Sequence, residues 1–191
     1  MSASKRKKYE MNAVGLVELS SIASGYEVSD EMLKTADVKL LVARTICAGK
    51  YMVIVGGDVA AVRSSVEAGR KVWEAAVIDS MVIPNVDPDV FPAIAGTNTP
   101  ESKGALGILE AFSVSSLIEG ADAAVKTANV TLIEIRLAMA LGGKAFVTMT
   151  GEVAAVRAAV EAGAAVIGEK GLLVNKVVIP SPSPVLYREV L

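Results

Sequence analysis

The chain has 191 residues, of which 52% are hydrophobic and 21% are charged, and its formal net charge is -2. This charge gives no electrostatic reason to expect nucleic acid as a partner, because the one basic run, residues 5–8, is short and terminal. No apolar run reaches the roughly 18 to 20 residues of a membrane span, and the basic N-terminus is not followed by the apolar core of a signal peptide. The sequence therefore predicts an unprocessed cytoplasmic protein that binds neither nucleic acid nor membrane.

The chain contains no histidine and a single cysteine, Cys47. Histidine is the commonest general base and the commonest metal ligand, and one cysteine cannot form an internal disulfide. No pair of carboxylates and no nucleophile-base set recurs at a useful spacing. We therefore expect that the protein is not an enzyme.

The first half of the chain alternates between strand and helix patterns. Runs rich in Val, Ile and Leu predict strands, Asp58 is typical of a helix N-cap, and Ser29-Asp30 indicates a helix start. The expected elements are strands at 13–19, 38–45, 51–55 and 79–84, with helices at 31–36 and from 59 onward. The order β-α-β-β-α-β predicts an α+β, ferredoxin-like domain, with helices on one face of an antiparallel sheet.

The same pattern occurs a second time. Residues 14–18 (VGLVE) return as 106–110 (LGILE) and residues 34–38 (KTADV) as 126–130 (KTANV), both shifted by 92. The shift grows to 94 between 58–63 (DVAAVR) and 152–157 (EVAAVR), and to 96 between 82–84 and 178–180. Two copies at so long a period indicate a duplicated domain and not a solenoid.

The duplication divides the chain into four parts. We expect an N-terminal tail at 1–11, a first domain at 12–94, a linker at 95–103 and a second domain at 104–191. The Gly, Asn, Pro and Ser content of 95–103 is typical of a domain boundary.

The repeated G-[IL]-[VL]-E, K-T-A and [DE]-V-A-A-V-R segments, with a Gly-Lys loop between them, resemble the bacterial microcompartment shell domain in its tandem form. The resemblance covers residues 12–191. It implies a homotrimer that forms a pseudo-hexameric tile and packs edge to edge with other shell proteins. It also implies that Lys34 and Lys126 lie along the tile edge, although a helix lysine is ordinarily just solvated. The residues that it implies around a central opening are Ile46, Lys50, Leu141, Gly142 and Gly143.

Cys47 allows two interpretations. A lone cysteine beside Ile46 is typical of a small buried side chain. The resemblance instead implies that three Cys47 thiols meet on a three-fold axis and hold one 4Fe-4S cluster per trimer, with Ala48 and Gly49 beside it. Such a tile would conduct electrons across the shell, with a flavin or iron-sulfur enzyme as redox partner. Ala48 departs from this resemblance, because proline is expected at its position.

Two alternatives remain open at this stage. In the first, the chain is a shell tile whose axis is a pore for small metabolites, and Cys47 binds no cluster. In the second, the duplicated domains form a metabolite-sensing regulator. In the corresponding loop of the second copy, residues 137–144, the one sulfur atom is the thioether of Met139. We expect this side chain to pack within the loop and not to bind a metal.

Overall fold

The computed structural model describes residues 11–100, 104–138 and 141–190, with the last three by their backbone alone. The described residues form two compact units. The first contains the chain up to Ala43 together with Met52–Asn85, and the second contains Arg44–Tyr51 together with the chain from Val86 onward. The tip of the first hairpin, 44–51, therefore belongs to the second unit. Among the described residues, no helix is both long and apolar enough to span a membrane.

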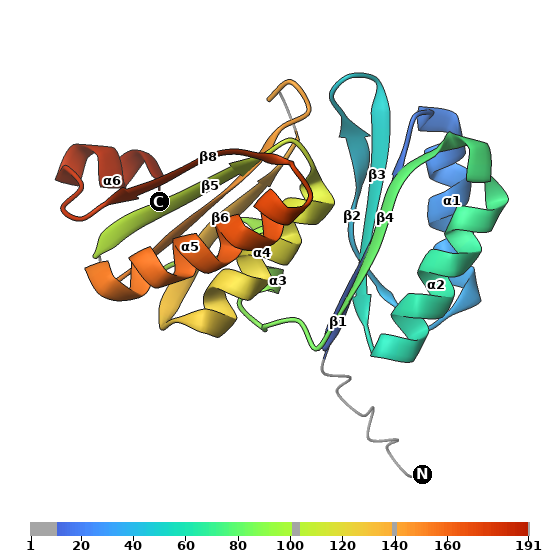
Figure 1. The fold of residues 1–191 in the computed structure, drawn as a ribbon. Coiled ribbons are helices and arrows are strands. Elements are labelled where there is room, and N and C mark those ends of the chain that lie inside the picture. Colours follow the sequence, from blue (N-terminus) through green and yellow to red (C-terminus); the bar gives the residue numbers. More distant parts are fainter. Residues whose placement is uncertain (1–10, 101–103, 139–140, 191) are drawn as a thin grey trace, which may run out of the picture. The chain divides into compact units, whose positions relative to one another are not determined.

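The predicted order of elements is confirmed in both repeats (Figure 1). The first repeat contains β1 (Ala13–Leu19), α1 (Ile22–Thr35), β2 (Lys39–Ile46), β3 (Lys50–Gly57), α2 (Val59–Val72), the short 3-10 helix η1 (Glu74–Ala76) and β4 (Val77–Pro84). The second contains β5 (Ala105–Ala111), α4 (Val114–Thr127), β6 (Val130–Leu137), β7 (Ala145–Gly151), α5 (Val153–Glu169) and β8 (Leu173–Ile179). Two further helices, α3 (Val90–Ala95) and α6 (Pro184–Val190), each follow a last strand.

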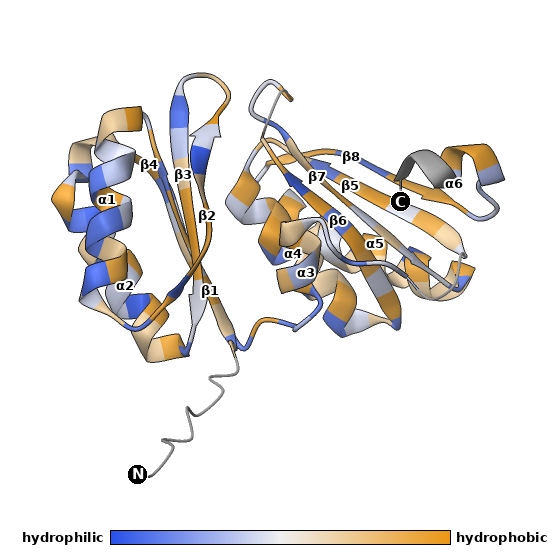
Figure 2. Ribbon diagram, turned by 180° about the vertical axis from the view of Figure 1, so that it is seen from behind, coloured by the Kyte–Doolittle hydropathy of each residue, from blue (hydrophilic) through white to orange (hydrophobic). Residues whose placement is uncertain are grey.

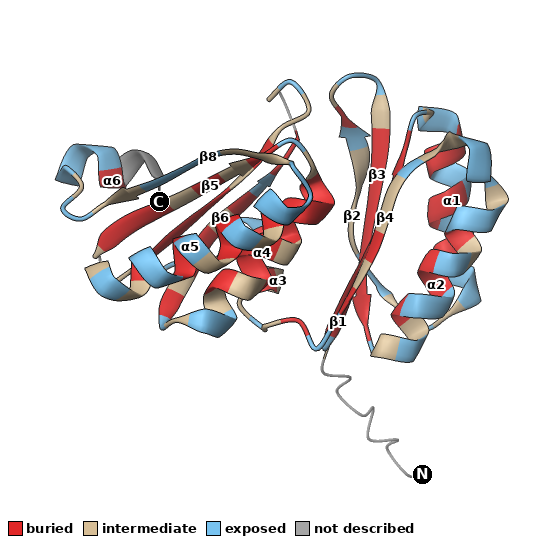
Figure 3. Ribbon diagram, viewed as in Figure 1, coloured by how far each residue is buried: buried red, intermediate tan, exposed pale blue. Residues whose placement is uncertain are grey.

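Each repeat folds into a four-stranded sheet with two helices on one face. The strand orders are β2-β3-β1-β4 and β6-β7-β5-β8, and the described pairings are antiparallel. The strand β1 is buried along its whole length and has a neighbouring strand on each side. In α1 and α2 hydrophobic and hydrophilic residues alternate (Figure 2), and the buried ones face the sheet (Figure 3).

The glycine of the repeated strand motif lets a helix approach the sheet. A Cβ at Gly15 would lie 2.5 Å from Val66 Cγ2, and a Cβ at Gly107 would lie 2.8 Å from Val156 Cγ1. Real Cβ contacts are longer, so only glycine fits under α2 and α5 in these positions. The recurrence of this glycine at a shift of 92 therefore has a packing reason.

Of the two helix starts predicted for the first repeat, one is confirmed and one is wrong. The Asp58 cap of α2 is confirmed, because its carboxylate accepts from the backbone N–H groups of Ala60 and Ala61 at 2.9 and 3.0 Å. The start of α1 at Ser29-Asp30 is wrong. The helix begins at Ile22, where the Ser21 hydroxyl accepts from Ser24 N–H. Small and polar residues on its buried face, such as Gly25, hid the helical period.

The glycine contact predicts the stability of two matched variants. We expect that Gly107→Ala lowers the free energy of unfolding by about 1–3 kcal/mol, because the added methyl overlaps Val156 and Val160. Gly168→Ala in α5 meets nothing within 4 Å, so it should leave stability unchanged or raise it by up to about 1 kcal/mol. Chemical denaturation of both variants measures the difference. Equal effects would show that close packing at Gly107 is unimportant.

Candidate functional site

Cys47 lies in the three-residue loop between β2 and β3. Ile46 before it is buried, the thiol itself is half-buried, and Ala48 and Gly49 are exposed. Gly49 makes the turn with φ +76°, and the peptide bond between Cys47 and Ala48 is cis. Lys50, half-buried, begins β3. The predicted cofactor residues therefore sit together at the tip of a tight hairpin.

The second loop, between β6 and β7, lies beside this tip. Within the second unit, the backbone N–H of Cys47 donates to the carbonyl of Ala138 over 3.1 Å. Gly142 is exposed, whereas Leu141 and Gly143 are half-buried, and both glycines have positive φ. The structure thus brings the two loops together, while the lining of an opening by their residues stays a prediction. Met139 lies outside the described residues.

The next residue, Lys144, is held by contacts of both its side chain and its backbone. Its ammonium forms an ion pair with Glu110 on β5, and its backbone N–H donates to the Leu141 carbonyl over 3.2 Å. Both contacts lie within the second repeat. They close the longer loop back onto the sheet.

The thiol of Cys47 is suited to an iron-sulfur cluster only if several chains contribute. Among the described residues, no group of three or more His, Cys, Asp or Glu side chains could hold a metal ion. One chain therefore offers one thiolate, which is the correct ligand type for iron-sulfur clusters. Gly49, two residues after the cysteine, is exposed, and a Cβ added there would meet nothing within 4 Å. The donor type and the open loop fit such a group.

The two predicted edge lysines lie at the opposite ends of strands from the loops. Lys34 is in the last turn of α1, just before β2, and Cys47 follows the end of the same strand. Eight strand residues span about 26 Å at roughly 3.3 Å each. Lys126 occupies the corresponding place before β6. The chain therefore separates its loop end from its lysine end by the length of a strand.

The lysines differ in how firmly they are held. Lys34 pairs with Asp30 on the surface, and the hydrogen bond and charge of Asp30 raise the pKa of Lys34. Lys126 Nζ lies 2.6 Å from Asp122 Oδ2, and its side chain is 41% exposed against 71% for Lys34. Sequence-equivalent lysines thus have different surroundings.

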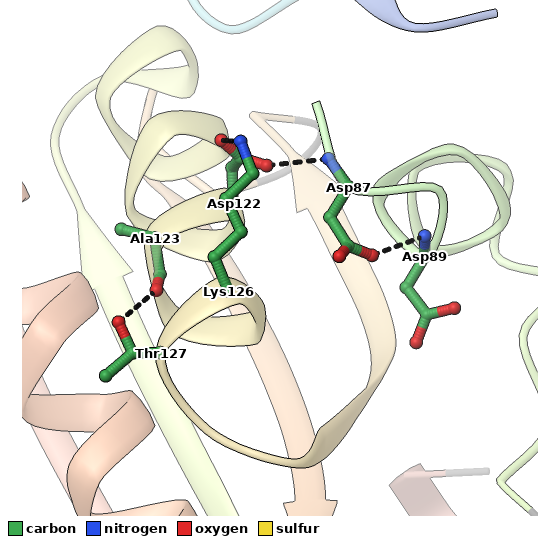
Figure 4. A network of polar contacts seen from close by, with 6 residues as sticks. All are labelled: Asp87, Asp89, Asp122, Ala123, Lys126 and Thr127. Carbon is green, nitrogen blue, oxygen red and sulfur yellow. Dashed lines mark hydrogen bonds and ion pairs between the residues drawn. The ribbon is translucent and has the colours of Figure 1, made fainter. Parts of the chain in front are cut away.

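Asp122 has a second partner that explains the difference (Figure 4). Its Oδ1 accepts from the backbone N–H of Asp87 over 2.8 Å, and Asp87 Oδ1 accepts from Asp89 N–H over 3.0 Å. Burial and the nearby Asp87 charge raise the pKa of Asp89. The buried carboxylate of Asp122 therefore fixes the segment before α3 onto α4. Sequence reasoning missed Asp122, although its recurrence as Asp30 at a shift of 92 was a signal.

Comparison with known proteins gives one consistent family. The family model for the BMC domain matches residues 13–86 and again 105–182. The chain is 44% identical over 177 residues to the bacterial microcompartment shell protein PduT of Citrobacter freundii, covering 93% of this chain and 96% of that protein.

Two solved structures share the fold. A microcompartment protein from Desulfitobacterium hafniense DCB has a TM-score of 0.90 and 51% identity, covering 94% of this chain and 99% of that one. The fused permuted hexameric shell protein MSM0275 from the RMM microcompartment has a TM-score of 0.59 and 23% identity, covering 82% and 81% of the two chains.

The Asp122 contacts predict a graded loss of stability. We expect that Asp122→Ala lowers the free energy of unfolding by about 1–3 kcal/mol, because the Asp87 N–H and Lys126 lose a buried acceptor. Asp122→Asn keeps a carbonyl oxygen for Asp87 and should lose less. Denaturant titration of both variants tests this order. If the two lose the same amount, the hydrogen bond to Asp87 contributes nothing.

Proposed function

This chain belongs to the BMC domain family, whose shell proteins are structural and not catalytic, and we propose that three copies form a shell tile with an iron-sulfur cluster on its axis. One observation carries this proposal: the only cysteine of the sequence stands half-buried at the tip of a short hairpin, next to the exposed residues Ala48 and Gly49. The proposed place of the tile is the shell of a bacterial microcompartment, among other shell proteins.

The duplicated fold supports a trimer. Two repeats with the same strand order in one chain give six similar domains in three chains, which can close a ring by one repeated type of contact. In such a ring each hairpin tip occurs three times. The proposed axis is the place where the three tips meet.

The residues around Cys47 would serve the cluster in distinct ways. Each chain gives one thiolate, so three chains hold three corners, and the fourth iron takes a ligand from outside the protein. When bound, the cluster supplies one-electron redox chemistry. The buried Ile46 fixes the base of the hairpin, and the hydrogen bond from Cys47 N–H to Ala138 fixes its tip against the second loop. Both contacts would hold the thiol in place without a change of loop conformation.

Electron transfer across the shell follows from this placement. A cluster on the axis would close the opening to metabolites and link the two faces of the tile for electrons. The ion pair between Lys144 and Glu110 would partly neutralise one positive charge near the axis. The proposed partner is a flavin or iron-sulfur redox enzyme.

Iron content tests the cluster directly. Protein purified or reconstituted without oxygen should contain about four irons per trimer, absorb as an iron-sulfur protein and give an EPR signal after reduction. Cys47→Ser should lose all three signals and remain trimeric, whereas the neighbouring Ala48→Ser should keep them. An iron-free wild-type trimer after anaerobic reconstitution would leave a tile with an unligated pore and refute the cluster.

The lysine end of the chain makes a separate prediction about tiling. We expect that Lys34→Ala and Lys126→Ala leave the trimer intact and weaken the assembly of trimers into sheets, because a long side chain at each tile edge is lost. Lys71→Ala, which removes an exposed lysine paired with Glu67 on α2, is the matched control. Electron microscopy of assembled sheets gives the readout. Normal sheets from both edge variants would remove the edge role.

A further inference from the structure

The two repeats differ at their matching edge strands, β2 and β6. In β6, Leu132 is fully buried, whereas its counterpart Leu40 in β2, at a shift of 92, is 40% exposed. The helix α3 packs against β6 and α4 in the second unit. Its own Val90, Ala93 and Ile94 are buried. The edge of the second repeat is thus covered by a helix, and the same edge of the first repeat is open.

The chain contains a second helix of the same design. At the shift of 96, Pro88 and Val90 at α3 correspond to Pro184 and Leu186 at α6. The turns that precede the two helices also match. Asp89 N–H donates to Asp87 Oδ1 over 3.0 Å, and Val185 N–H donates to Ser183 Oγ over 3.3 Å. The helix α6 is therefore the repeat counterpart of α3 in both sequence and local hydrogen bonding.

The helix α6 is anchored on one side and open on the other. Tyr187 is buried, and its hydroxyl hydrogen-bonds to Thr150 on β7. Leu186 is 42% exposed, whereas its counterpart Val90 is fully buried. An apolar side chain at a position that is buried in the other repeat indicates a surface that another molecule covers.

We infer that α6 of one copy docks on the α1–β2 surface of a second copy, in the way that α3 docks on α4 and β6 within one chain. The occupant is a second copy because α3, the counterpart of α6, packs on the matching surface of the other repeat. Leu186 would cover the region of Leu40. The inference rests on the proposed trimer and names the contact that closes it.

A polar contact accompanies the apolar one. Asp122 accepts from Asp87 N–H, and the counterparts of these residues are Asp30 and Ser183. Asp30 repeats the ion pair of Asp122 with the lysine one turn later, and its side chain is 62% exposed against 10% for Asp122. In the docked state, Asp30 of one copy accepts from Ser183 N–H of the next. Three such head-to-tail contacts complete a closed ring.

Two neighbouring residues of α6 provide the test and its control. Leu186→Asp places a charge in the docked surface, so it should weaken trimer formation at least about tenfold in sedimentation analysis. Val185→Asp adds the same charge at a more exposed site, 59% against 42%. The counterpart of Val185 is Asp89, already acidic, so this variant should remain trimeric. An undiminished trimer for Leu186→Asp would overturn the docking.

Sedimentation of the wild type and the two variants distinguishes a failure of the α6 contact from a failure of the proposed trimer. If the wild type is monomeric, the proposed trimer fails. If the wild type and both variants are equally trimeric, the trimer stands and the α6 contact fails. Circular dichroism of Leu186→Asp shows whether the lost trimer reflects docking or unfolding.

A crosslink tests the same contact without disturbing the apolar surface. With Cys47→Ala as background, Asp30→Cys and Ser183→Cys together should form a disulfide between copies under mild oxidation, because a direct hydrogen bond places the two residues at crosslinking range. Denaturing gels without reductant should then show covalent dimers and trimers. Either single variant is the control. A bond within one chain, or none, would contradict docking between copies.

Discussion

The absence of a Cβ at Gly15 and Gly107 determines how closely a helix packs on the sheet in each repeat. It lets one helix of each repeat approach the central strand more closely than any other residue would allow. The ends of α1 and α4 lie before β2 and β6, the strands that lead into the two hairpin loops. Each hairpin loop is therefore separated from the preceding helix end by the length of one strand. Positions at the two ends of a strand can be used for different purposes without disturbing one another.

The two repeats have the same fold, but their edge strands have different neighbours. Each repeat has the same strand order, but β6 is covered by α3 whereas β2 is open. The aspartates that pair with Lys126 and Lys34 differ in the same way. Asp122 accepts a hydrogen bond from the backbone of Asp87, whereas its counterpart Asp30 lies on the surface. In the proposed docking, a contact that exists inside the chain for one repeat is made by a second copy for the other. The exposed residues of the first repeat are thus best understood beside the buried residues of the second.

Much of the fold could be predicted from the sequence, because strand patterns and repeats are local signals. The strand at 13–19 matches β1, and the duplication and the Asp58 cap are confirmed. The start of α1 was missed because its buried face is made of small residues that pack on α2, which only the tertiary structure shows. The helix α3 was missed because it is short and because prolines such as Pro88 and Pro92 are unfavourable in most helix positions. In fact Pro88 precedes the helix, where its missing N–H costs nothing, and Pro92 falls within the first turn.

For the candidate site, the sequence located Cys47 and its loop, but it could not show that the Cys47 backbone bonds to Ala138, since the two are far apart in the chain. Asp122 was hidden for the same reason. The presence of the cysteine in one repeat only has a consequence for the number of ligands in a ring. In a ring of identical single domains an axial side chain appears as often as there are domains. Here the cysteine stands in one repeat only, so any ring of this chain carries one thiol per two domains. In the proposed trimer, the fusion of two domains would therefore place three thiols at the centre of an assembly of six domains.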